Sequence, residues 1–185
     1  VIENPIFNND HGKKISPEKN KKIGFLGRLS EEKGALFVAK NLSYIADQII
    51  FIGDGKVNKE ILKINKNFVI TGWLSHEDVK NELKKLRAII FPSLLYETDG
   101  LSVKEAGFYG IPSIVSKDIA ASRNIKHKFN GLIFDPNKIN ELKDSIETVN
   151  DDKMLKALSD NCYSQFNSMK YTQETFYSRL IECLK

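Results

Sequence analysis

The sequence has little cysteine, little tryptophan and no long hydrophobic run. Its two cysteines, Cys162 and Cys183, lie far apart and in no metal-ligand spacing, which favours free thiols in a reducing compartment. The apolar runs are only a few residues long, whereas a membrane-spanning helix needs about 20. No signal-peptide pattern follows Val1. These absences predict a cytoplasmic protein without a transmembrane helix.

The composition is that of an ordinary globular domain. The chain has 185 residues, of which 41% are hydrophobic and 28% are charged. This length predicts one domain with enough apolar surface for a core. The 28 basic and 24 acidic residues give a net charge of +4, and most of the cations are lysines scattered along the chain. Nucleic-acid binders usually gather their excess charge on one face, so no nucleic-acid partner is expected.

The first 20 residues are predicted to be an interdomain linker, and residues 21–185 a folded domain. The linker contains Pro5, Gly12 and Pro17 with few apolar residues. Its lysines are expected to be solvated. Membrane-surface binding is the alternative, but no amphipathic helix accompanies the lysines.

From residue 23 onward, short apolar runs alternate with helical patterns. This alternation predicts an α/β fold with a doubly wound, Rossmann-like parallel sheet covered on both faces. Strands are expected at 23–27, 48–53, 67–71, 88–92 and 113–116, and helices at 33–46, 56–65, 75–86 and 100–109. Ser75 and Asp78 resemble a capping box, and Gly110 marks a helix end. A loop and short strand at 123–134 and a helical tail over 137–185, with a cap at Thr172, complete the prediction.

The loop after the first expected strand has the composition of a phosphate site. It reads GRLSEEKG over residues 27–34, where Gly27 lets the backbone turn closely. Arg28 and Lys33 offer a guanidinium fork and an ammonium to a diphosphate. The alternative is that they only balance Glu31 and Glu32. The G-x-G-x-x-G and P-loop patterns are both absent.

The segment after the fourth expected strand, residues 92–112, carries the densest signal. It places Glu97 before a helix and Glu105 inside it. The N–H groups of Gly100, Leu101 and Ser102 would face an anion at the helix start. Carboxylates beside a phosphate site suit sugar and ribose hydroxyls. A glycosidase acid–base pair is an alternative, but it leaves the cations unexplained.

Two shorter loops and the remaining motifs add less. Gly53-Asp54-Gly55 is expected to be a tight turn. Trp73, the only tryptophan, either covers the sheet edge or lines a base pocket. No D-x-D, H-E-x-x-H or G-x-S-x-G motif occurs, so no metal site and no hydrolase elbow is predicted.

The segments GRLSEEKG, GDG, TGWL and PSLLYETDGLSVKEAGFYGIPSIVS, in this order, resemble the C-terminal domain of the retaining family 4 glycosyltransferases of GT-B fold. The resemblance covers roughly residues 1–150. Its hallmark is a pair of glutamates separated by seven residues, here Glu97 and Glu105. Thr98-Asp99 departs from the family pattern, which commonly has a bulky residue there.

The resemblance implies a role for each motif. Arg28 and Lys33 would hold the donor diphosphate and stabilise the leaving nucleoside diphosphate. Glu97 would contact the donor sugar, and Glu105 the ribose. The donor would also be bordered by a further set of residues: Gly27, Leu74, Thr98, Asp99, Gly100, Leu101 and Ser102. No metal and no other cofactor is expected.

The resemblance also implies partners that the chain itself does not supply. A GT-B enzyme has two such domains, and the N-terminal one holds the acceptor, a glycan or glycolipid. The chain is therefore expected to bind a nucleotide-sugar donor, to be inactive alone, and to serve polysaccharide synthesis in an enzyme that contacts the inner face of the membrane. Two alternatives remain, namely half of a sugar-nucleotide epimerase and a non-catalytic nucleotide-binding interaction domain.

Overall fold

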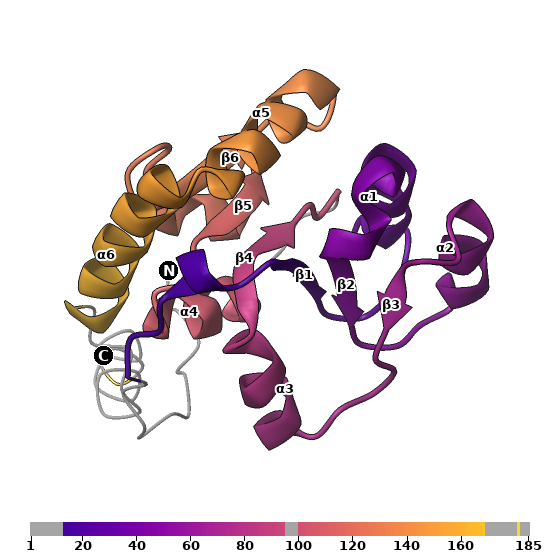
Figure 1. Cartoon of the computed structure of the whole chain (residues 1–185), viewed down its shortest axis with the longest axis horizontal. Coiled ribbons are helices and arrows are strands. Elements are labelled where there is room, and N and C mark those ends of the chain that lie inside the picture. The colour runs from indigo at the N-terminus through magenta and orange to yellow at the C-terminus, as the bar shows by residue number, and fades with distance from the viewer. Residues whose placement is uncertain (1–12, 95–99, 169–180, 182–185) are drawn as a thin grey trace.

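The computed structural model describes residues 13–94, 100–168 and 181. Its centre is a six-stranded sheet in which every strand pair is parallel, in the order β3-β2-β1-β4-β5-β6 (Figure 1). The strands are β1 (Lys22–Leu26), β2 (Ile49–Ile52), β3 (Val69–Ile70), β4 (Leu86–Phe91), β5 (Ser113–Ser116) and β6 (Gly131–Phe134). The helices are α1 (Ala35–Asn41), α2 (Asn58–Ile64), α3 (His76–Leu83), α4 (Leu101–Phe108), α5 (Ile139–Asn150) and α6 (Asp152–Ser168).

The strand order is that of a doubly wound nucleotide-binding fold, so the α/β prediction is confirmed. β4 lies at the centre and is buried along its whole length, as its apolar sequence predicts. The order of the strands reverses between β1 and β4. Ligands bind at such a switch point, beyond the carboxyl ends of the strands.

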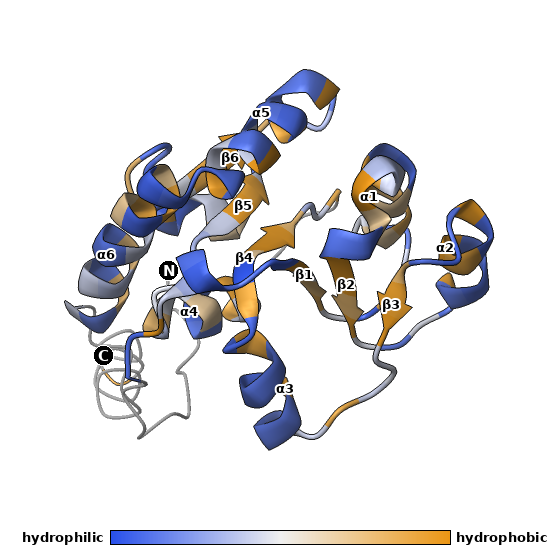
Figure 2. Ribbon diagram, in the orientation of Figure 1, coloured by the Kyte–Doolittle hydropathy of each residue, from blue (hydrophilic) through white to orange (hydrophobic). Residues whose placement is uncertain are grey.

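Helices cover the sheet on both faces and produce two hydrophobic cores. Residues of α1, α2 and α5 pack on one face, and residues of α3 and α4 on the other. α6 joins the two cores, since Leu155 and Leu158 belong to the first while Cys162 and Phe166 belong to the second. Figure 2 shows the apolar strands inside and the hydrophilic helix faces outside. No helix in the described ranges is long and apolar enough to cross a bilayer.

The expected helix over 33–46 was wrong in its second half. α1 begins after Gly34, which has a left-handed φ of 79°, and ends at Asn41. A 3-10 helix, Ser43–Gln48, follows because Leu42 leaves helical geometry. A second 3-10 helix, Ala120–Asn124, lies between β5 and β6. The Ser75 cap is confirmed, since its hydroxyl accepts the Asp78 N–H at 3.2 Å.

Residues 13–20 lie against the domain instead of projecting from it. Lys14 pairs with Asp160 of α6 at 2.9 Å, and the Ile15 N–H donates to the Tyr109 carbonyl at 3.1 Å. A 3-10 turn, Pro17–Lys19, follows.

Arg87 of β4 connects residues 13–20 to the corner between α5 and α6 through hydrogen bonds. Its guanidinium donates to the carbonyls of Asn20 (2.7 Å), Glu18 (3.3 Å), Val149 (2.6 Å) and Asn150 (3.2 Å), and it pairs with Asp152.

Cys162 is a buried free thiol, and burial raises its pKa to about 12. Cys183 and Thr172 lie outside the described residues.

Candidate functional site

Two loops meet at the switch point of the sheet. One follows β1 and contains Arg28 and Lys33, and the other follows β4 and leads into α4. The Leu94 N–H donates to the Glu32 carbonyl at 3.0 Å, and the Ser102 hydroxyl lies 3.5 Å from the Leu26 carbonyl. The basic loop and the start of α4 therefore share one edge of the sheet, as the sequence predicts.

Glycine is needed where these loops touch. A Cβ atom on Gly34 would lie 2.4 Å from the Pro92 carbonyl oxygen. At the start of α4, Gly100 has a φ of 70°, and a Cβ atom there would lie 2.4 Å from that of Ala121. Any other residue would separate the two loops or displace the helix start.

α4 points the first N–H groups of its helix toward this edge. The Val103 N–H already bonds to the Gly100 carbonyl at 2.9 Å. The N–H groups of Leu101 and Ser102 precede the first intrahelical bond and carry the positive end of the helix dipole. Leu101 is exposed and Ser102 half-buried, so both can approach a ligand. Glu97, Thr98 and Asp99 lie outside the described residues.

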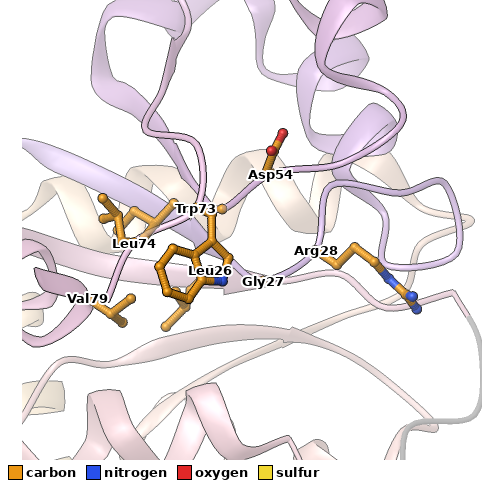
Figure 3. A pocket seen from close by; sticks show the side chains of 9 residues that line it. Leu26, Gly27, Arg28, Asp54, Trp73, Leu74 and Val79 are labelled. Carbon is orange, nitrogen blue, oxygen red and sulfur yellow. The ribbon is translucent and has the colours of Figure 1, made fainter. Parts of the chain in front are cut away.

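A hollow of about 410 Å³ opens beside the β1 loop. It is lined by Leu26, Gly27, Arg28, Ile52, Gly53, Asp54, Trp73, Leu74 and Val79. Figure 3 shows Leu74 and Val79 at one end, the Trp73 indole over Leu26 in the middle, and the Arg28 guanidinium pointing away at the other end. The hollow thus has an apolar end and a cationic end.

Trp73 lies at the rim of this hollow with 81% of its surface exposed. Of the two interpretations of Trp73, the structure favours the pocket lining. Three further lining residues were not predicted from the sequence: Leu26, Ile52 and Val79. The sequence did contain a clue to Val79, because it follows the Ser75 cap by four positions and therefore lies on the same helix face. Nothing in the sequence showed where α3 packs.

Arg28 is available to a ligand. Its side chain is 69% exposed and its one described ion pair, to Glu32, spans 3.5 Å. The pKa of Glu32 is lowered mainly by a hydrogen bond from the backbone of Glu32 itself and next by the Ser30 hydroxyl. The charge of Arg28 lowers this pKa less. The ion pair with Glu32 therefore engages the Arg28 guanidinium only weakly. Lys33 lies half-buried on the same loop.

Asp54 shapes the hollow from the loop after β2. Its carboxylate accepts the Gly55 N–H at 2.8 Å and an amide hydrogen of Asn58. The Asp54 carbonyl accepts the Leu29 N–H at 2.8 Å, which ties this turn to the basic loop. The turn of this loop lies at Lys56 and Val57, directly after the predicted Gly53-Asp54-Gly55, and the Asp54 carboxylate is held by the neutral N–H donors of Gly55 and Asn58.

Glu105 is half-buried in α4, one turn after Leu101. Burial is the largest influence on its carboxyl and raises its pKa, while the charges of His76 and Lys80 on α3 act in the opposite direction. A carboxylate held against solvation in this way accepts hydrogen bonds from hydroxyl groups readily. Among the described residues, no group of three or more His, Cys, Asp or Glu side chains could hold a metal ion.

Solved structures share this fold. The lipopolysaccharide outer core galactosyltransferase WaaB superposes with a TM-score of 0.77 at 21% identity, covering 100% of this chain and 54% of that one. The HepE protein of Anabaena, solved with UDP, superposes with a TM-score of 0.76 at 20% identity, covering 89% of this chain and 48% of that one.

Proteins related in sequence to this chain are also glycosyltransferases. The chain is 28% identical over 163 residues to the UDP-Gal:alpha-D-GlcNAc-diphosphoundecaprenol alpha-1,3-galactosyltransferase of Escherichia coli, covering 78% of this chain and 41% of that enzyme. It thus spans less than half of that relative's length. The family model "Glycosyl transferases group 1" matches residues 7–165. With its Rossmann-like sheet, the chain therefore belongs to the group 1 glycosyl transferases and forms a domain of the GT-B type.

Proposed function

We propose that this domain binds the nucleoside diphosphate sugar donor of a retaining glycosyltransferase. The observation that carries the proposal is the hollow at the carboxyl ends of β1, β2 and β3, which is apolar at one end and is bordered by Arg28 at the other. A nucleoside diphosphate has the same division, with a flat base at one end and two phosphates at the other. The HepE structure contains UDP, and the Escherichia coli relative is named for a UDP-galactose donor, which supports this donor class.

In this arrangement the base lies on the Trp73 and Leu74 side of the hollow. The sugar's diphosphate extends past Gly27 toward Arg28 and Lys33. The ribose hydroxyls bond to the Glu105 carboxylate. For the base and the diphosphate, this order follows the lining from Trp73 and Leu74 to Gly27 and Arg28 (Figure 3). Lys33 and Glu105 lie outside that lining, and their roles are part of the proposal.

The charged groups act on the leaving group. As the bond between the sugar and the diphosphate breaks, negative charge grows on the phosphate oxygens. Arg28, Lys33 and the N–H groups of Leu101 and Ser102 stabilise that charge, and they are already in place before the reaction begins. Glu97, Thr98 and Asp99 are proposed to contact the donor sugar, with Gly100 fixing the turn. The proposed chemistry assigns no step to a metal ion.

The acceptor is proposed to be a glycan or glycolipid held by a second domain. The chain covers 41% of the length of its Escherichia coli relative, so it lacks a counterpart for much of that enzyme. We propose that this domain alone binds the donor and transfers no sugar, and that the whole enzyme acts in the cytoplasm in polysaccharide synthesis.

The position of Trp73 provides a direct test. It is the only tryptophan, so quenching of the intrinsic tryptophan fluorescence reports on the hollow alone. UDP, GDP and UDP-sugars should change this fluorescence with saturable binding, while inorganic pyrophosphate should bind with little change in emission. Absence of binding by every nucleoside diphosphate and nucleotide sugar at millimolar concentration, measured by calorimetry as well, would contradict the proposal.

A further inference from the structure

The loop between the 3-10 helix Ala120–Asn124 and β6 is a rigid projection. Asn130 is fully buried, and its amide accepts the Lys126 N–H at 2.6 Å while donating to the Asn124 carbonyl at 2.9 Å. The Lys128 N–H donates to the Gly131 carbonyl at 2.8 Å, and Lys128 has a left-handed φ of 61°. These bonds fix the backbone at the tip of the loop.

The side chains at this tip are basic and aromatic. Arg123, Lys126 and Lys128 are exposed, and none of them has an ion-pair partner in the part of the chain that the structure describes. The Lys126 ammonium lies 5.8 Å from the centre of the Phe129 ring, which remains 47% exposed. The sequence has no acidic residue between Asp118 and Asp135.

Some other lysines of the chain are engaged by the fold. Lys14 is paired with Asp160, and Lys85 lies 2.6 Å from Glu82. Lys84 stacks over the Tyr109 ring at 5.5 Å. Lys126 and Lys128 differ from these lysines in having no ion pair with a carboxylate among the described residues.

The neighbouring face of α6 extends the surface with neutral side chains, and an acidic residue lies beside Met154, namely Asp151, whose carboxylate accepts the Met154 N–H at 2.9 Å. The Asn161 amide donates to the Phe129 carbonyl at 3.0 Å, and Gln165 donates to the Asn124 carbonyl at 2.9 Å. Met154, 44% exposed, and Ala157 continue this face at helical spacing from Asn161. The acidic Asp160 is directed to Lys14 instead. Figure 1 shows α6 beside β6.

We propose that this surface, made of Arg123, Lys126, Lys128, Phe129 and Met154, is a docking site for an anionic lipid bilayer. Uncompensated cations need a surface of negative charge, and the exposed ring and thioether need an apolar boundary. A bilayer with anionic headgroups supplies both within a few ångströms. A phosphate polymer such as DNA supplies only the charge.

The loop that carries Lys126, Lys128 and Phe129 lies opposite the proposed donor site. The loop precedes β6, whose first residue, Gly131, is in register with Ser113, the first residue of β5. It therefore sits at the amino edge of the parallel sheet, while the hollow lies at the carboxyl edge. A domain docked through this loop keeps the hollow open to the water phase, from which a nucleotide sugar arrives.

Co-sedimentation with vesicles tests the proposal on the full chain. Vesicles of phosphatidylcholine containing phosphatidylglycerol should bind the protein, vesicles of phosphatidylcholine alone should not, and salt should weaken the binding. The double variant Lys126→Glu/Lys128→Glu should lower the partition coefficient at least about tenfold. Phe129→Ser should lower the partition coefficient by a smaller factor than the double variant. This loss should persist at high salt, because the contribution of Phe129 is apolar.

The matched control is Lys59→Glu/Lys63→Glu, which makes the same charge change at exposed positions of α2. This control should retain binding within about twofold, because α2 is distant from the loop in the fold (Figure 1). Three results would overturn the proposal: no binding of the unmodified chain to anionic vesicles, an equal loss in the control, or binding to a DNA duplex without binding to vesicles.

The donor site provides an independent readout. The loop variants and the control should all retain the UDP response of Trp73, because none of these residues lines the hollow. Vesicle binding without UDP binding would contradict only the proposed function, and the reverse result would contradict only the docking site.

Discussion

Two arginines of this chain show how the same side chain can serve a ligand or the fold. Arg28 is 69% exposed with one long ion pair, whereas the side chain of Arg87 is 8% exposed and donates to four carbonyls and one carboxylate. The donors of Arg87 are used within the protein, and those of Arg28 remain for a partner. The exposure of a cation and its hydrogen bonds within the protein therefore indicate a binding role better than its presence in a motif does.

The largest effect is expected from Arg87→Met. Methionine leaves the carbonyls of Asn20 and Val149 without their donor in a buried site, so the free energy of unfolding should fall by about 3 kcal/mol or more. Chemical denaturation measures this loss. Arg123→Met, at an exposed arginine, is the control and should change stability by less than about 0.5 kcal/mol. A similar small change in both variants would remove the distinction between the arginines.

Arg28→Ala should give the opposite pattern. Its removal should leave the unfolding free energy within about 0.5 kcal/mol and weaken UDP binding by about 1.5–3 kcal/mol, because a charged hydrogen bond to the diphosphate is lost. Titration followed by Trp73 fluorescence measures the affinity, with Arg123→Ala as control. An unchanged affinity would show that the β1 loop does not bind the phosphates.

The half-buried carboxyl Glu105 extends the comparison to an acid. Burial raises its pKa, so the folded protein holds its proton more tightly than the unfolded chain. Its contribution to stability therefore decreases as the pH rises from the unfolded value toward the folded one. Glu105→Gln should make the ligand-free domain more stable at neutral pH, measured by thermal unfolding.

The same variant should weaken nucleoside binding more than pyrophosphate binding, because the amide replaces a charged acceptor of the ribose hydroxyls. Equal losses for both ligands in calorimetry would remove the ribose role from Glu105.

The smallest effect is expected at Asp135, an acid that serves the fold. A hydrogen bond from Lys117, whose Nζ lies 2.8 Å from its carboxylate, is the largest cause that lowers the pKa of Asp135. Its stabilising contribution is therefore present above the unfolded pKa and is lost as the pH falls through the folded pKa. Asp135→Asn should make stability less sensitive to pH on the acid side. A profile that matches the unmodified chain would show that this pair contributes nothing measurable.

The arrangement of the proposed donor site was partly predictable from the sequence. The loop order places Arg28, Leu74 and the start of α4 at one edge, because all parallel strands end at the same edge of the sheet. The lining by Leu26 and Val79 was not predictable, since it depends on how α3 packs over the end of β1. The extent of α1 was also missed, because apolar spacing over 33–46 fits a helix although the chain leaves helical geometry at Leu42.

Apart from the extent of α1, the main helices and strands and the family follow from the sequence alone, because strand and helix periodicity and short motifs are local properties. The exposure of Arg28 and the burial of Arg87 depend on the tertiary structure, since Arg87 meets its partner Val149 across 62 residues of chain. The packing of α6 into both cores also depends on the tertiary structure, as does the finding that Lys126 and Lys128 form no ion pair within the described ranges. Contacts between distant segments depend on packing geometry, which a one-dimensional pattern does not contain.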